Sequence, residues 1–361
     1  HDNRGDYDTA LDYYDKSLNI REEIGDKDGM GHTLSNIGNV HINKGDYDTA
    51  LEYQNRALKI REEIGDKDGM GNNLISIGIV YNDKGEYDKA LEYYDRALKI
   101  DEEIGDKRGV GYSLNSIGIV HYYKGNYDKT LEYYERSLKI REEIGDKYGM
   151  GYSINNIGNV HDDKGEYDKA LDYYGRSLAI REELGDKRGM GHTLNNIGLV
   201  HVRKGEYDKA LEYYDRSLKI QEEIGDKYGM GYSLSSIAIV YHDKEEYDKA
   251  AEHLEKSLAI QKEIGFKELE LSTTTYLYLS YRHLSREYDE QDIHSLIKDA
   301  DNIEFEVNFR LYQLLDDTSY LEIAYKQVQD KASEMEEEIG KTFLGYPLPT
   351  AIVEEWEKHS D

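Results

Sequence analysis

The feature that most constrains this chain is an internal repeat with a period of 40 residues. The segment at residues 44–48 (KGDYD) returns at residues 84–88 (KGEYD), and related segments begin at 124, 164, 204 and 244. A second marker, IGDK at residues 24–27, recurs at the same interval up to residue 224, with Leu for Ile at 184. The two markers divide each period into two pieces of helical length. Such units bury one face on their neighbours, so the chain needs no single round core.

The first piece of each period predicts a helix, which we call helix A. Its apolar or small positions in one period are Leu34, Ile37, Gly38, Val40 and His41. Separations of three and four residues place these side chains on one helical face. We expect helix A to end at Gly45, because a residue without Cβ readily adopts the left-handed conformation that closes a helix. Asp46 is then expected to cap the next helix.

The second piece predicts another helix, helix B. Its apolar positions in the same period are Tyr47, Ala50, Leu51, Ala57, Leu58 and Ile60. Gly65 is expected to stop this helix, and Asp66 to cap the following helix A. Connections of two or three residues between helices of roughly 15 to 20 residues force antiparallel hairpins. Hairpins repeated in register stack into a superhelix, so the predicted fold class is an all-α solenoid.

These residues resemble the tetratricopeptide repeat. The pattern that carries the resemblance is Leu34-x2-Ile37-Gly38-x2-His41, followed by Gly45, Tyr47, Ala50-Leu51 and Ala57-Leu58. It recurs six times, and the resemblance implies a right-handed superhelical solenoid. Three positions depart from the usual motif: Leu34 replaces Trp, Gln54 replaces an aromatic residue, and Glu62 replaces the helix-ending Pro. The 40-residue period resembles a longer-helix subgroup that includes Pins-type adaptors, kinesin light chains and bacterial signalling proteins.

The repeat also predicts how the chain is divided. Residues 1–26 correspond to the end of a truncated repeat, 27–264 to six full repeats, 265–300 to a degenerate hairpin, and 301–361 to a helical C-terminal cap. Because the first residue aligns with His41 inside a helix A, we expect a fragment of a longer protein. Further helices are expected over residues 303–315, 320–335 and 351–356.

The role of this C-terminal region has two interpretations. A terminal cap must present a polar outer face to water, which is the first interpretation. The alternative is a docking surface, because residues 344–349 (LGYPLP) break the helix and bring apolar groups close to Trp356.

Composition excludes several classes of partner. The formal charge is −29, from 75 acidic and 46 basic residues, which repels nucleic acid and anionic lipid head groups. The chain contains no cysteine, so it has neither a disulfide framework nor a thiolate metal site. No apolar run approaches the roughly 18 residues that suggest a membrane span. We therefore expect a soluble, cytoplasmic protein without nucleic acid or membrane partners.

No motif indicates catalysis, a metal or a cofactor. Residues 25–31 (GDKDGMG) have glycines ahead of a helix, but they lack the Gly-Lys-Ser/Thr order of a phosphate loop. Histidines at 41, 121, 161 and 201 stand at the same position of four repeats, too far apart to share one metal, and are expected to pack between hairpins. The adjacent residues His161, Asp162 and Asp163 point in different directions on a helix. We therefore expect a protein that is not an enzyme.

The resemblance implies that A helices line a concave surface, so their variable positions form the candidate peptide-binding set. These candidates are Asn36, Asn39, Tyr112, Asn115, Tyr152, Asn155, Asn156, Asn159, His192, Asn195, Asn196, Arg203 and Tyr232. Asparagine donates and accepts hydrogen bonds, which suits the amides of an extended peptide, and tyrosine adds apolar area with a polar tip. The alternative is that some of the Asn and Ser side chains only bond the neighbouring hairpin.

These features favour one function and leave others open. The leading hypothesis is a protein-interaction scaffold that binds a polar or basic peptide or a partner domain in the concave groove. No Lys occurs at the candidate positions, which disfavours a clamp for the C-terminal carboxylate of a peptide. Arg203 is a basic exception at a repeat position that is occupied by Asp83, Asp163 and Asp243 in other repeats. The alternative is the regulatory or sensor region of a larger bacterial signalling protein with an upstream output domain. A third possibility is end-to-end self-association through the truncated N-terminal edge.

Overall fold

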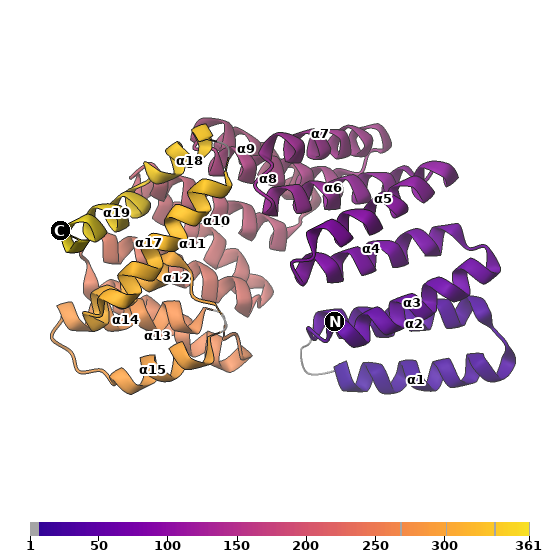
Figure 1. The fold of residues 1–361 in the computed structure, drawn as a ribbon, viewed down its shortest axis with the longest axis horizontal. Coiled ribbons are helices and arrows are strands. Elements are labelled where there is room, and N and C mark those ends of the chain that lie inside the picture. The colour runs from indigo at the N-terminus through magenta and orange to yellow at the C-terminus, as the bar shows by residue number, and fades with distance from the viewer. Residues whose placement is uncertain (1–6, 268, 301, 336, 361) are drawn as a thin grey trace. The chain divides into compact units, whose positions relative to one another are not determined.

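The computed structural model describes residues 7–267, 269–300, 302–335 and 337–360, which form 19 α-helices and no strand (Figure 1). The A helices are α2 (Lys27–Asn43), α4 (Lys67–Asp83), α6 (Lys107–Tyr123), α8 (Lys147–Asp163), α10 (Lys187–Arg203) and α12 (Lys227–Asp243). The B helices are α1 (Tyr7–Ile24), α3 (Tyr47–Ile64), α5 (Tyr87–Ile104), α7 (Tyr127–Ile144), α9 (Tyr167–Leu184), α11 (Tyr207–Ile224) and α13 (Tyr247–Ile264). These hairpins confirm the predicted all-α solenoid. The helix A expected to end just before α1 falls on residues 1–6, outside the described residues.

The chain divides into two compact units, His1–Ser153 and Ile154–Asp361, with the boundary inside α8. We call them unit 1 and unit 2. In unit 1, each A helix packs on the B helix that follows it, in the pairs α2–α3, α4–α5 and α6–α7. Unit 2 contains the equivalent pairs α10–α11 and α12–α13, followed by the C-terminal helices. The same hairpin geometry therefore recurs within each unit.

The predicted turns and caps are confirmed. Gly45 and Gly65 have φ of 75° and 73°, the left-handed conformation that ends a helix. The Asp46 side chain accepts a hydrogen bond from the Thr49 amide, and Asp66 accepts one from the Gly69 amide. These contacts satisfy first-turn amides of α3 and α4 that have no partner within the helix. The N-cap residues of the B helices α5, α7, α9, α11 and α13 make no such side-chain contact.

Glycine inside the A helices is required by close packing against helix B. A Cβ at Gly78 would lie 2.5 Å from the ring of Tyr94, and a Cβ at Gly198 would lie 2.6 Å from the ring of Tyr214. Where the B-helix residue is the smaller Leu254, the A-helix position is Ala238, and both side chains are fully buried. Close packing therefore requires glycine on helix A opposite a Tyr ring on helix B, whereas the smaller Leu254 leaves room for Ala238.

Exposed ion pairs link the A and B helices within hairpins. Lys27 on α2 lies 2.9 Å from Glu63 on α3, and Lys187 on α10 lies 2.9 Å from Glu223 on α11 in unit 2. Each such surface pair contributes about 0 to 1 kcal/mol.

The C-terminal helices all belong to unit 2. They are α14 (Glu270–His283), α15 (Glu290–Asp299), α16 (Phe305–Leu315), α17 (Thr318–Glu334), α18 (Glu337–Leu344) and α19 (Pro347–Ser360). The helices expected over 303–315, 320–335 and 351–356 correspond to α16, α17 and α19, but α19 starts earlier, because Pro347 fits the first turn of a helix. Helix α18 was not expected. None of the described helices is long and apolar enough to cross a membrane.

Candidate interaction surface

The candidate residues differ in how far solvent reaches them. Those with exposed side chains are Asn36, Asn39, Tyr112, Tyr152, His192 and Tyr232. Those that are half-buried are Asn115, Asn156, Asn159, Asn196 and Arg203. Asn155 and Asn195 are buried, with 9% and 4% of their surface exposed. Within each unit, the exposed and half-buried residues form what we call the A-helix face of that unit.

Asn155 and Asn195 hold successive A helices together in unit 2. The Asn155 Oδ1 accepts a hydrogen bond from Thr193 Oγ1 at 3.2 Å. The Asn195 Oδ1 accepts one from Ser233 Oγ at 2.9 Å. Because both carboxamides are buried in contacts with the next A helix, we leave them out of the A-helix face.

Two further asparagines combine packing with partial exposure. Asn196 Nδ2 donates to Asn159 Oδ1 at 3.2 Å, and the Tyr174 hydroxyl donates to the same oxygen at 2.7 Å. In unit 1, Asn39 Oδ1 likewise accepts from Gln54 Nε2 at 2.8 Å while its side chain stays exposed. These hydrogen bonds therefore fix the orientation of the asparagine side chains at the edge of the A-helix face.

Exposed tyrosine rings supply apolar area on the A-helix face. Tyr112 and Tyr152 in unit 1 are 47% and 43% exposed, and Tyr232 in unit 2 is 39% exposed. The Tyr152 hydroxyl lies 3.3 Å from that of Tyr148, and their rings meet edge to face. Burial raises the pKa of Tyr112, so its hydroxyl stays neutral at physiological pH. Neutral amides and phenols on this face suit a peptide backbone.

The recurring histidines pack on helix B, as the sequence predicts. The rings of His161 and His201 stack on Tyr173 and Tyr213 with centroids 5.2 and 5.3 Å apart. Within the described residues, no group of three His, Asp or Glu side chains is arranged to hold a metal ion. These rings therefore serve the packing of the hairpins.

The last residues of helices α8, α10, α12 and α14 in unit 2 form a row that we call the rim. It consists of Asp162, Asp163, Arg203, His242, Asp243, Arg282 and His283. Arg203 Nη1 lies 2.6 Å from Asp162 Oδ2 and 3.8 Å from Asp163 Oδ1. Burial raises the pKa of Asp162 to about 6, and the Arg203 guanidinium opposes that shift. Arg203, a candidate for peptide contact, is therefore engaged in a largely buried ion pair.

The C-terminal segment of unit 2 folds back onto this rim (Figure 1). The Tyr346 hydroxyl, between α18 and α19, donates to the backbone oxygen of Asp163 at 3.1 Å. Its ring packs on Tyr167 with centroids 6.3 Å apart. At the other end of the rim, Arg282 Nη1 donates to the backbone oxygen of Gln313 at 2.7 Å. Contacts thus connect helices far apart in the sequence.

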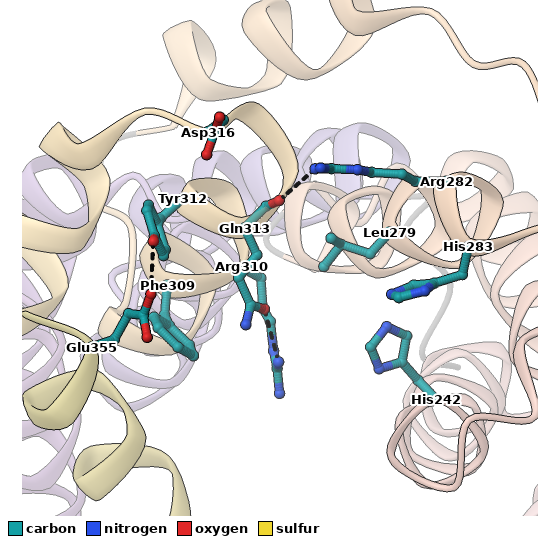
Figure 2. A pocket seen from close by; sticks show the side chains of 10 residues that line it. All are labelled: His242, Leu279, Arg282, His283, Phe309, Arg310, Tyr312, Gln313, Asp316 and Glu355. Atoms are coloured by element: carbon teal, nitrogen blue, oxygen red, sulfur yellow. Dashed lines mark hydrogen bonds between the residues drawn. The ribbon is translucent and has the colours of Figure 1, made fainter. Parts of the chain in front are cut away.

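A cavity of about 430 Å³ lies between the rim and the C-terminal helices, and we call it the cap pocket (Figure 2). Its lining residues are His242, Leu279, Arg282, His283, Phe309, Arg310, Tyr312, Gln313, Asp316 and Glu355. Sequence reasoning missed this site because its residues come from α12, α14, α16 and α19, far apart in the sequence.

The apolar residues near Trp356 join the core of the C-terminal region. Trp356 stacks on Tyr325 with ring centroids 5.3 Å apart. Leu344, Tyr346 and Leu348 pack partly buried around the same core. The segment that was a candidate docking surface thus combines a packing role with the contact at the rim.

Comparisons with known proteins agree with this geometry. The family model described as "Tetratricopeptide repeat" matches residues 3–63, 29–103, 109–183 and 189–263. No curated protein matches the chain.

Solved structures share the fold at low sequence identity. BtubC (BKLC) from P. vanneervenii is 21% identical, with a TM-score of 0.54, over 61% of this chain and 92% of that one. A signal-transduction ATPase with numerous domains (STAND) and a tetratricopeptide repeat sensor, from Pyrococcus horikoshii, is 19% identical, with a TM-score of 0.59. That match covers 99% of this chain and 55% of the ATPase. A Rap protein complexed with Competence and Sporulation Factor is 16% identical, with a TM-score of 0.55, over 98% and 99% of the two chains.

Proposed function

Because this chain belongs to the tetratricopeptide repeat family, we propose that it is a non-enzymatic interaction module that binds a polar or basic peptide or partner segment along its A-helix face. Repeats of this family generally act as protein-interaction scaffolds. The observation that supports the proposal is the recurrence of exposed Tyr side chains at equivalent positions of the successive A helices α6 and α8, together with exposed or half-buried Asn side chains on α2, α6, α8 and α10. Tyr112 and Tyr152 stand 40 residues apart in the sequence and are both nearly half exposed.

Tyrosine and asparagine suit this role for separate reasons. A tyrosine ring covers a large apolar area at a small cost in side-chain entropy, and its hydroxyl still bonds water or ligand. An asparagine such as Asn36 carries both a donor and an acceptor, which matches the alternating groups of a peptide backbone. The strongly acidic character of the chain, with a net charge of −29, favours a basic over an acidic ligand.

The test is a titration with a peptide selected on the wild-type chain from a random-sequence display library. We expect the double substitution Tyr112→Ala and Tyr152→Ala to weaken binding at least about tenfold, since aromatic anchors dominate such interfaces. The matched control is Tyr13→Ala, which removes a ring 67% exposed on the B helix α1. Equal affinity of the double variant and the wild type would contradict the proposal.

A second candidate function is that of a regulatory or sensor region in a larger signalling protein. One similar structure is titled as a STAND protein with a tetratricopeptide repeat sensor, and a Rap protein was solved with Competence and Sporulation Factor. We would express the chain with its native flanking sequence and measure any flanking catalytic or DNA-binding activity with and without the selected peptide. A change in that activity favours the sensor, and an unchanged activity favours the scaffold.

Two further proposals concern the cellular setting. We propose a cytoplasmic location, which fractionation of the source cells tests. We also propose that the N-terminal edge, formed by helix α1, lets two copies associate end to end. Light scattering over a range of concentrations tests this, and a monomer at the highest concentration would contradict it.

A further inference from the structure

We propose that the cap pocket of unit 2 binds an oxyanion, a carboxylate or a phosphate, between the Arg310 guanidinium and the imidazoles of His242 and His283. The proposal does not rest on the peptide-binding function of the A-helix face. It assigns a ligand class to a cavity built from the last repeat and the C-terminal helices.

The charge inside the pocket differs from that of the whole chain. Against a net charge of −29, the lining contains two arginines and two histidines but only two carboxylates. One carboxylate, Glu355, already accepts hydrogen bonds from Tyr312 and Lys358, at 2.9 and 3.0 Å. Figure 2 shows Glu355 on the opposite side of the pocket from the two facing imidazoles. The histidine side of the lining therefore carries the cationic groups.

Arg310 is held in place with donor capacity remaining. Its Nε donates to the Tyr276 hydroxyl at 3.2 Å, and its Nη1 donates to Gln313 Oε1 at 2.9 Å. The guanidinium also lies over the Tyr276 ring, 5.2 Å from its centroid. Its Nη2 lies 3.9 Å from the Asp243 carboxylate, beyond hydrogen-bond distance. A fixed guanidinium with an available N–H pair suits planar recognition of an oxyanion.

The two histidines add further donors on the same side. The buried Nε2 of His242 has no hydrogen-bond partner among the described residues. The His283 ring stacks on Tyr247 with centroids 4.1 Å apart and lies 6.2 Å from the His242 ring. Burial, and then the nearby His242, lower the pKa of His283. A bound anion would favour the charged imidazoles, so an oxyanion compensates for burying them.

Three carboxylates near Arg310 and His283 oppose the binding of an anion. Burial lowers the pKa of Arg310, but Tyr276, and then Asp243 and Glu306, raise it. Glu245 likewise acts to raise the pKa of His283. The three carboxylates reduce the local positive charge without filling the cavity. Arg282 has a separate role, because its guanidinium bonds the backbone oxygens of Gln313 and Leu314 at the end of α16. The proposal therefore rests on Arg310 and the two histidines alone.

The experiment is an NMR titration of imidazole resonances in the full chain, with inorganic phosphate, with acetate, and with one peptide in carboxylated and amidated forms. We expect saturable shifts of His242 and His283 with a dissociation constant of about 1 mM or tighter for at least one oxyanion. Half-buried His253 on α13, which does not line the pocket, is the internal control. Saturation by phosphate or acetate indicates a small anion, and saturation only by the carboxylated peptide indicates a chain terminus. Both outcomes support the site.

A paired variant separates the site from a nonspecific effect. His242→Gln with His283→Gln is expected to weaken anion binding at least tenfold, whereas His253→Gln leaves it unchanged. Circular dichroism checks that each variant is folded, and Arg310→Lys, which keeps the charge but loses the planar fork, is the second probe. The proposal fails if no oxyanion gives a saturable shift, if His253 shifts equally, or if the folded variants bind as the wild type does.

Discussion

The A helices of unit 1 and unit 2 end at equivalent positions of the repeat, but the surroundings of these ends differ. In unit 1, Asn43, Asp83 and Tyr123 are exposed at these ends. In unit 2, the equivalent Asp163 and Arg203 are half-buried while Asp243 is exposed, and Tyr346 bonds the backbone of Asp163 from 183 residues away. The repeat therefore sets the helix and its turn, whereas a distant segment sets the environment of the helix end.

The largest expected difference between the two units comes from Arg203→Ala. Removing the guanidinium leaves the buried Asp162 carboxylate unpaired, which should destabilise unit 2 by about 3 kcal/mol at pH 8. The matched change in unit 1, Tyr123→Ala, removes a ring that is 57% exposed and should cost less than about 1 kcal/mol. Urea unfolding followed by Trp356 fluorescence measures unit 2, and circular dichroism measures the unit 1 variant.

Two controls sharpen this prediction. Adding Asp162→Asn to Arg203→Ala should recover much of the loss, because no charge then remains buried. The loss should also shrink below pH 6, since the pKa of Asp162 is already raised to about 6 and its protonated form needs no partner. Equal losses for Arg203→Ala and Tyr123→Ala would show that the two helix ends have the same environment.

Inside the hairpins, by contrast, the two units should respond alike. Gly78→Leu in unit 1 and Gly198→Leu in unit 2 place a side chain against Tyr94 and Tyr214, and each should cost about 1 to 3 kcal/mol. The same logic predicts that Ala238→Leu overpacks Leu254. Thermal unfolding checks all three, and an unchanged melting curve would mean that the packing register is wrong.

A smaller effect is expected at Asp101, which breaks the repeat pattern in unit 1. Burial raises its pKa to about 6, the Ser113 hydroxyl opposes this, and Asp106 raises it further. Because the folded pKa lies above the unfolded value, stability is lost as pH rises through about 6. Asp101→Asn should therefore stabilise the chain by about 1 kcal/mol at pH 8 and leave it unchanged at pH 3.5.

Denaturation at both pH values tests this prediction against Asp95→Asn, an exposed carboxylate on the same helix α5. The control should show no comparable dependence on pH. A gain for Asp101→Asn at low pH, or none at pH 8, would contradict the assignment.

The smallest effect is expected at Glu245, where unit 2 departs from the glycine found at this turn. Glu245 has φ of 61°, whereas Gly85 and Gly205 occupy the same place with φ of 73° and 72°. A side chain in this conformation costs about 1 to 2 kcal/mol, part of which glycine loses again through its greater freedom in the unfolded chain. Glu245→Gly should raise stability by about 0.5 to 1 kcal/mol in a thermal melt, and Gly205→Glu should lower it.

Local features of this fold could be predicted from the sequence, and non-local ones could not. Gly45, Asp46 and Gly65 act within a few residues of themselves, so spacing alone located the turns. The Tyr346 contact with Asp163 joins residues 183 apart, and no period relates them. The short helix α18 was not predicted either, because no repeat period covers it.

For the candidate site, too, the sequence predicted which helix a residue lies on but not its contacts with other helices. Position in the repeat placed Asn155 and Asn195 on the A helices, but their burial depends on Thr193 and Ser233 of the next helix. Arg203 stood out by its charge, yet its partner Asp162 became evident only in three dimensions. The cap pocket could not be predicted, because it lies between helices whose arrangement the repeat does not determine.

The central claim is that a ligand occupies the A-helix face, and thiol labelling tests it most directly because the chain has no cysteine. Asn36→Cys places a thiol on that face, and Lys59→Cys places one at an exposed position of the B helix α3. We predict that the display-selected peptide slows labelling at Asn36→Cys at least tenfold and leaves Lys59→Cys unchanged. Protection of Lys59→Cys with unprotected Asn36→Cys would contradict the account.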